Sequence, residues 1–265
     1  MKQTITLLVT ALLMMAGVQT AQAQKMKIYF TSGEPVGYDI QKIDHIEFEE
    51  SEPEVESEWV DLGLPSGTLW ATYNVGASGP QDSFYGNYFA WGEITSRCNV
   101  SNYDWGFYRF STISNATLTK YCWSSSKGNY GYTDDLKELQ PEDDAATVNW
   151  GSNWQIPSKE QFEELINTEY TTTEWTQDGP KSGRLITSRK NGKSIFLPAL
   201  GLILYDTSPL YNNQGCYWSR TLSTTSPDLA VGLNFSSDGI SVSDINAERC
   251  LGFTVRPVRV QKANQ

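Results

Sequence analysis

Histidine is almost absent from this chain. Its 265 residues contain one histidine, His45, which lies outside the large domain that the sequence predicts at residues 59–260. Ser-His-Asp and Cys-His catalysis need an imidazole beside the nucleophile, and H-E-x-x-H zinc sites need two. The predicted domain therefore cannot contain a serine-hydrolase triad, a papain-like dyad or a histidine-ligated metal site. His45 itself stands in an alternating strand pattern and is expected to face solvent.

Clusters of basic residues and paired cysteine motifs are also missing. The chain has 20 Lys+Arg against 31 Asp+Glu, a formal net charge of −11, and no basic run. A nucleic-acid partner is therefore not expected. None of the four cysteines has C-x-x-C spacing, which disfavours thioredoxin-like and zinc-ribbon chemistry. An even number in an exported chain suggests two disulfides without fixing their pairing, and four buried, reduced cysteines are the alternative.

The only long apolar run lies at the start of the chain. Ile5 to Ala16 is about a dozen residues, too short to cross a bilayer, and Lys2 precedes it. Ala21-Gln-Ala23 is a small-x-small cleavage signal. The sequence therefore predicts a signal peptide at 1–23, a mature chain beginning at Gln24, and a periplasmic, cell-surface or extracellular destination. A membrane anchor is the alternative, but no basic stop-transfer flank follows, and no later run is long enough to span.

The exported part divides into three segments and a tail. Residues 24–48 alternate apolar and polar positions around a turn at Ser32-Gly-Glu-Pro35, which predicts a short β-rich segment too small to fold alone. Residues 49–58 are acidic and contain Pro53, a composition that predicts an extended linker. The main domain follows at 59–260, and 261–265 form a tail.

Helix signals in the main domain are few. Ser158-Lys-Glu-Gln161 is a capping box followed by apolar residues at helical spacing, which predicts a helix over 158–167. A second short helix is expected from Thr133, with Pro141 ending it. Asp143 or Asp144 is expected to cap one further turn through Val148.

The rest of the domain is predicted to be short strands and long loops. Gly, Asn, Ser and Asp separate the apolar runs, and Ser236-Ser-Asp-Gly239 indicates a hairpin. Strands are expected at 69–75, 88–91, 194–197, 215–219, 229–235, 240–242 and 252–260.

A set of short motifs stands in a fixed order along the chain. The motifs are Asp61-Leu-Gly-Leu-Pro-Ser-Gly-Thr-Leu-Trp-Ala71, Phe89-Ala-Trp-Gly-Glu93, Asp143-Asp-Ala-Ala146, Trp154-Gln-Ile-Pro-Ser158, Leu197-Pro-Ala199, Tyr217-Trp-Ser219 and Val255-Arg-Pro-Val258. In this order they resemble the Fibrobacter succinogenes major paralogous domain family, which is similar to the formylglycine-generating-enzyme branch of the C-type-lectin-like fold. This resemblance implies an α+β domain with a small twisted antiparallel sheet, one or two short helices and long loops.

The function expected from these features is recognition without catalysis. Long loops on a rigid sheet suit binding, and aromatic faces stack on sugar rings or protein partners. The partner would be a carbohydrate or a cell-surface protein. The competing interpretations are that the loop aromatics only pack the loops, and that the domain is purely structural. The candidate ligand-binding residues are Trp105, Tyr108, Trp123, Tyr130 and Trp175.

The alternative is an enzyme. Catalysts of the formylglycine-generating branch bind copper through two cysteines close together in sequence, whereas the closest pair here is Cys98 and Cys122. The chain also lacks the calcium-binding motifs of true C-type lectins, and Glu142-Asp-Asp144 fits helix capping better than cation binding. No catalytic residue, metal or cofactor is therefore predicted, although a pair of carboxylates could meet as in glycosidases.

The resemblance also implies a disulfide pairing. In this fold the strands that begin near Cys216 and Cys250 belong to the terminal sheet region, within disulfide reach. Joining Cys216 to Cys250 would leave Cys98 with Cys122.

Overall fold

The chain forms two compact units, Met1–Pro53 and Glu54–Gln265. The computed structural model describes residues 25–28, 36–39, 58–79, 85–97, 102–205, 213–244 and 247–260. The predicted signal peptide, His45, most of the acidic linker, Cys98 and the tail lie outside the described residues.

The first unit contains an antiparallel strand pair, as the sequence predicts. Strand β1 (Lys25–Ile28) pairs with β2 (Val36–Asp39), and Ile28 lies opposite Val36.

A five-stranded sheet is the centre of the second unit, with the order β11-β10-β9-β12-β5. The β9–β12 pair is parallel and the other pairs are antiparallel. The 236–239 hairpin is confirmed, because Phe235 pairs with Ile240 across it. The strands are β5 (Tyr88–Phe89), β9 (Gln214–Leu222), β10 (Ala230–Ser236), β11 (Ile240–Ser243) and β12 (Phe253–Thr254).

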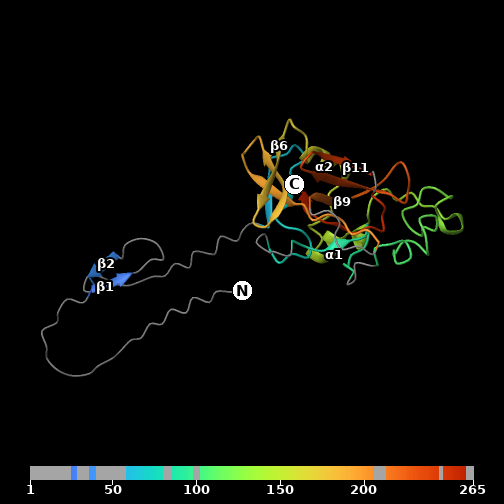
Figure 1. Cartoon of the computed structure of the whole chain (residues 1–265), viewed down its shortest axis with the longest axis horizontal. Helices are drawn as coiled ribbons and strands as arrows, with labels where there is room; N and C mark the ends of the chain where they lie inside the picture. Colours follow the sequence, from blue (N-terminus) through green and yellow to red (C-terminus); the bar gives the residue numbers. More distant parts are fainter. Residues whose placement is uncertain are drawn as a thin grey trace, which may run out of the picture. The chain divides into compact units, whose positions relative to one another are not determined.

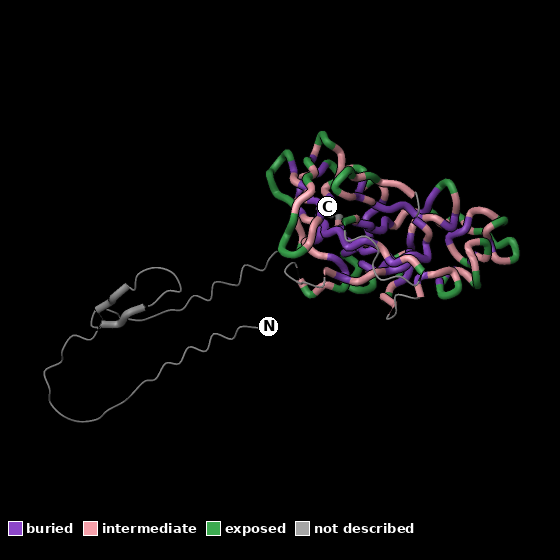
Figure 2. The backbone as a smooth tube through the Cα atoms, in the orientation of Figure 1, coloured by how far each residue is buried: buried purple, intermediate pink, exposed green. Residues whose placement is uncertain are grey.

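Strand β9 separates two hydrophobic cores. Successive side chains of a strand point to opposite faces, so Tyr217 enters the core that contains Trp70, and Trp218 enters the core that contains Trp91. Trp218 stacks on Phe253 with ring centroids 3.9 Å apart. Figure 2 shows buried positions running through the middle of this unit, with exposed positions at the loop tips. Three of the motif tryptophans, Trp70, Trp91 and Trp218, therefore pack the two cores.

Two three-stranded antiparallel sheets accompany the central one. Their orders are β13-β4-β3 and β6-β7-β8. In the second, β6 and β7 pair along their whole lengths, from Thr171 opposite Ser188 to Asp178 opposite Lys181. The strands are β3 (Trp59–Asp61), β4 (Thr68–Ala71), β6 (Thr171–Asp178), β7 (Lys181–Ser188), β8 (Ser194–Pro198) and β13 (Val258–Val260).

Both α-helices in the described residues begin at caps that the sequence predicts. In α1 (Ala145–Trp150) the Asp144 side chain accepts a hydrogen bond from the backbone N–H of Thr147. In α2 (Lys159–Leu165) Ser158 and Gln161 form the complete capping box. Short 3-10 turns stand at η3 (Asn129–Gly131) and η4 (Pro141–Asp143). The coarse prediction of an α+β domain with few helices and several small sheets agrees with this arrangement.

Two local predictions are wrong. No helix follows Thr133, because the Asp134 carboxylate accepts the backbone N–H groups of Tyr121 and Cys122 as well as that of Leu136, and Glu138 forms a β-bridge with Thr221. The predicted strand 252–260 is two strands in different sheets. Between them the buried Arg256 precedes Pro257, which has no N–H to donate to a ladder.

The capping box gives a first test of the fold. We expect Ser158→Ala to lower the free energy of unfolding by about 1 kcal/mol, because the first turn of α2 loses its side-chain acceptor. Urea denaturation measures the change. Ser237→Ala, in the exposed 236–239 turn, is the control and should change stability by less than about 0.5 kcal/mol. Equal losses in the two variants would contradict the prediction.

Candidate functional site

The irregular stretch at residues 102–132, which we call the aromatic loops, extends from one end of the second unit. Figure 1 shows them in green, at the end opposite the β6–β7 hairpin. They contain little regular structure, but backbone hydrogen bonds join them. Leu118 N donates to Lys127 O at 2.9 Å, and Asn129 N donates to Leu118 O at 2.8 Å. The loops are therefore tied to each other as well as to the sheet.

A buried arginine holds the base of these loops. The Arg249 guanidinium carbon lies 4.8 Å from the centroid of the Trp91 ring, 5.3 Å from that of Tyr108 and 5.8 Å from that of Tyr121. Its nitrogens donate to the Tyr108 hydroxyl and to the carbonyls of Lys120, Tyr121 and Pro227. Cation–π contacts and carbonyl dipoles thus solvate a charge that has no water around it.

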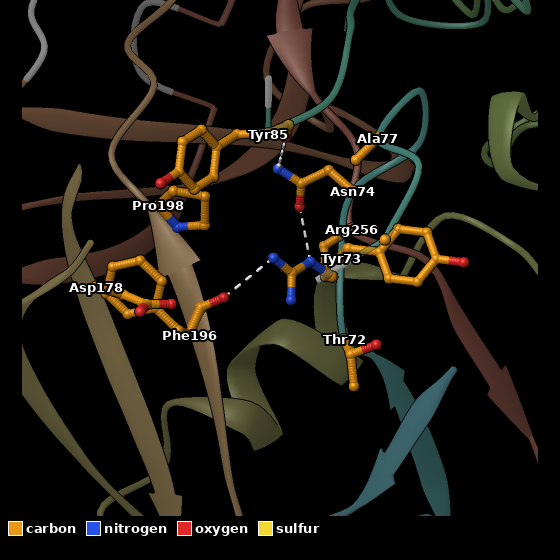
Figure 3. Close-up of a pocket in the computed structure, with 10 residues that line it drawn as sticks. Thr72, Tyr73, Asn74, Ala77, Tyr85, Asp178, Phe196, Pro198 and Arg256 are labelled. Carbon is orange, nitrogen blue, oxygen red and sulfur yellow. Dashed lines mark hydrogen bonds between the residues drawn. The ribbon is translucent and has the colours of Figure 1, made fainter. Parts of the chain in front are cut away.

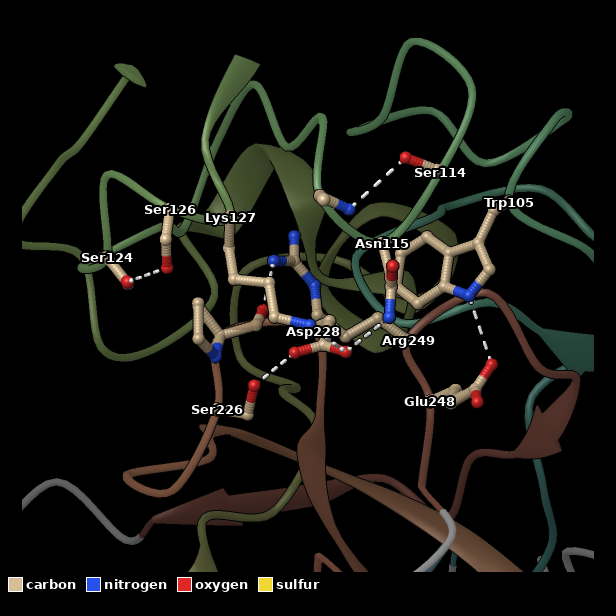
Figure 4. Close-up of polar contacts among 12 residues, drawn as sticks. Trp105, Ser114, Asn115, Ser124, Ser126, Lys127, Ser226, Asp228, Glu248 and Arg249 are labelled. Atoms are coloured by element: carbon tan, nitrogen blue, oxygen red, sulfur yellow. Dashed lines mark hydrogen bonds and ion pairs between the residues drawn. The ribbon is translucent and has the colours of Figure 1, made fainter. Parts of the chain in front are cut away.

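A second anchor is the carboxylate of Asp228 (Figure 4). Its Oδ2 accepts from Asn115 Nδ2 and from Lys127 Nζ, both at 3.0 Å, and its Oδ1 accepts from the Ser226 hydroxyl. Burial by itself would raise the pKa of Asp228, but the hydrogen bonds from Ser226 and Lys127 hold it below its ordinary value. Asn115 and Lys127 belong to different loops, so Asp228 fastens both to the chain that precedes β10.

The five predicted binding residues have different environments. Tyr108 is buried at 2% exposure, and its hydroxyl donates to Trp91 O, so its ring belongs to the Arg249 cage and is not open to a ligand. Trp123 is half-buried, and its indole N–H donates a hydrogen bond to the backbone carbonyl of Ser223. Trp175 lies on β6, packed against Phe235 and away from the loops. These three do not meet in one site.

Tyr130 is the most exposed of the five. It stands in η3 with its side chain fully in solvent and its backbone in the left-handed region, at φ 51° and ψ 35°. A bulky residue in that region is uncommon and costs on the order of 1 kcal/mol. The loop therefore presents this ring at a small cost in backbone strain.

Trp105, the remaining candidate, belongs to a group that we call the Glu248 patch, made of Trp105, Tyr205 and Glu248. The indole N–H of Trp105 donates to Glu248 Oε2 at 3.0 Å, and the Tyr205 hydroxyl donates to the same oxygen at 3.3 Å (Figure 4 shows the first bond). Trp105 is half-buried and Tyr205 is 44% exposed. Among the described residues, the hydrogen bonds to the Glu248 carboxylate all reach Oε2, including a weak one from the Cys250 thiol at 3.8 Å, and Oε1 accepts none.

Tyr205 and Glu248 were not predicted from the sequence. Isolated β-bridges join Tyr103 to Tyr205 and Leu229 to Glu248, and these long-range pairs bring the patch together. No local motif marks either residue. Burial, followed by the nearby Glu248 carboxylate, raises the pKa of Tyr205, so its hydroxyl remains a donor at neutral pH.

The cysteines whose side chains the structure describes are buried thiols. Cys122, Cys216 and Cys250 are free thiols in the structure. Burial raises the pKa of Cys216 to about 12 and also raises that of Cys250. Cys98 lies outside the described residues, and the pairing of Cys216 with Cys250 and of Cys98 with Cys122 stays a prediction that non-reducing peptide mapping tests.

Comparisons with protein-family models, with curated proteins and with solved structures find no match to this chain. Within the described residues, no group of three or more His, Cys, Asp or Glu side chains is placed to hold a metal ion. No helix in the same part of the chain has the length and apolar character needed to span a membrane.

The Asp228 anchor predicts a pH-dependent stability. We expect Asp228→Asn to lower the free energy of unfolding by about 1–3 kcal/mol at pH 7, because charge-assisted hydrogen bonds from Lys127 and Ser226 are weakened. The folded-state pKa is lowered, so the stabilisation is present above the unfolded pKa of about 3.9 and is lost as pH falls through the folded value.

Urea titrations of the parent and the variant between pH 7 and pH 3 measure this difference. Asp238→Asn removes the same charge from an exposed turn and should cost less than about 0.5 kcal/mol. A constant difference between Asp228→Asn and the parent down to pH 3 would show that the carboxylate charge does not stabilise the loops.

Proposed function

We propose that this protein is an exported, non-catalytic recognition module that binds a glycan at the cell surface through the Glu248 patch. The observation that carries the proposal is the hydrogen bonding of the Glu248 carboxylate, one oxygen of which accepts hydrogen bonds from Trp105 and Tyr205. The predicted signal peptide supports export.

The chemistry of the patch suits a sugar. Aromatic rings provide the apolar face on which a pyranose stacks. A carboxylate oxygen accepts hydrogen bonds from hydroxyl groups, and such charge-assisted bonds are the stronger kind. Because Trp105 and Tyr205 already orient Glu248, little side-chain entropy is lost when a ligand binds. Phe107, two residues from Trp105 and 61% exposed, adds further apolar surface on the same loop.

We further propose that the domain is a member of the Fibrobacter succinogenes major paralogous domain family with a C-type-lectin-like fold. The order of the short motifs supports this, as does an α+β arrangement with long loops at one end. In such a fold, loops held on a rigid sheet are the usual binding surface.

A non-catalytic role is favoured over cysteine and copper chemistry. Copper is bound by thiolates, and burial of Cys216 and Cys250 disfavours the thiolate form of both. A purely structural role is the remaining alternative, and a binding experiment separates it from recognition.

A glycan array probed with residues 24–265 is the experiment. We expect saturable binding to at least one glycan class, and a roughly 10- to 100-fold weaker affinity for Glu248→Gln, since about 1.5–3 kcal/mol of charge-assisted hydrogen bonding is lost. Tyr205→Ala should also weaken binding, because it removes both a stacking face and a support of Glu248.

Tyr130→Ala is the matched control. It removes an exposed loop tyrosine outside the Glu248 patch and should leave the affinity unchanged. Loss of binding in Tyr130→Ala with normal binding in Glu248→Gln would place the site at the η3 tip. Absence of any glycan binding by the folded parent protein would favour the structural role.

A further inference from the structure

A small pocket lies beside Arg256, another buried arginine of the domain. It has a volume of about 100 Å³, and its walls include Asn74, Ala77, Asp178, Phe196 and Arg256 (Figure 3). These residues come from the chain after β4, from β6 and β8, and from the segment between β12 and β13. The pocket is separate from the Glu248 patch, because the two share no residue.

Arg256 is 1% exposed, and its hydrogen-bond partners are all neutral. Its Nε donates to Asn74 Oδ1 at 2.7 Å, and its two Nη atoms donate to Ala71 O and Phe196 O at 3.0 Å. The Tyr217 hydroxyl is a fourth partner. A guanidinium has five N–H bonds, one more than these four acceptors.

Among the described residues, the positive charge of Arg256 is therefore balanced by dipoles alone, because none of their carboxylates makes an ion pair with it. Burial lowers the pKa of Arg256 to about 10, so the group still carries its charge at neutral pH. A buried charge without a counter-charge is costly, and an anion that entered the pocket would reduce that cost.

Asn74 keeps the guanidinium in place at the pocket wall. Its amide is 1% exposed, and Nδ2 donates to Tyr85 O at 2.8 Å while Oδ1 accepts from Arg256. Gly86 allows this packing, since a Cβ there would lie 2.8 Å from Asn74 Cβ. The orientation of Arg256 toward the pocket is thus fixed before any ligand arrives.

We propose that this pocket binds a small carboxylate, whose charge pairs with Arg256. A water occupies about 30 Å³ in the liquid, so the pocket has room for a group the size of acetate. The one guanidinium N–H that the four acceptors leave can donate to a carboxylate oxygen, and such a charge-assisted hydrogen bond is the stronger kind. The single acidic residue among the described lining residues, Asp178, is exposed at the end of β6 and repels the ligand weakly.

Acetate is the probe, titrated against the full mature chain at constant ionic strength set with sodium chloride. We expect saturable shifts of the Arg256 Nε–H and Asn74 amide resonances in ¹H–¹⁵N NMR spectra. Asp178→Asn should tighten acetate binding roughly two- to fivefold, as removing an exposed like charge does. Asp238→Asn makes the same charge change away from the pocket and should not alter the affinity.

Ala77→Leu is the blocking variant. Ala77 is half-buried at the pocket wall, and the larger side chain should occupy the space and abolish the shifts, whereas Ala116→Leu in an exposed loop should not. Shifts that grow linearly with acetate, or that persist unchanged in Ala77→Leu, would overturn the proposal. Should Ala77→Leu fail to fold, an unchanged affinity in Asp178→Asn would overturn it as well.

Discussion

The burial of the Arg249 charge constrains the aromatic loops more than any other contact. Solvating a guanidinium inside a protein requires acceptors on every side. Here ring faces come from Trp91, Tyr108 and Tyr121, and carbonyls come from two segments, Lys120–Tyr121 and Pro227. Each contributor must stay in place or leave the charge without a partner. Loops with almost no helix or strand can therefore hold one conformation and present side chains at fixed positions.

Arg256 is buried in a related way. Arg249 contacts the core on the Trp91 side of the central sheet, and Arg256 contacts Tyr217 on the other side. Both arginines rely on neutral acceptors, but their surroundings differ. Arg249 is enclosed by three aromatic rings, whereas Arg256 has carbonyls and an amide, and one side faces a pocket. Aromatic rings cover the part of the Arg249 guanidinium that backbone carbonyls do not reach. The corresponding part of Arg256 faces the pocket.

Local structure could be predicted where it depends on residues a few positions apart. The Ser158–Gln161 capping box and the 236–239 turn are complete within four residues, so their sequence suffices. The helix expected from Thr133 failed because Asp134 binds a backbone twelve or thirteen residues away. The β6–β7 hairpin was not predicted, although a run of threonines before a Gly-Pro turn is typical of a hairpin.

The candidate site was less predictable because exposure depends on distant partners. Tyr108 and Tyr130 both lie in polar, glycine-containing loops, yet Arg249, far along the chain, buries only the first. Trp105 and Glu248 are separated by 143 positions, and nothing near either residue marks the contact. Aromatic content therefore identifies which loops need support, but it does not separate the rings that supply support from those that face solvent. The Glu248 carboxylate identifies rings that face solvent. Its hydrogen bonds hold the exposed ring of Tyr205 and the half-buried ring of Trp105 in place without burying them.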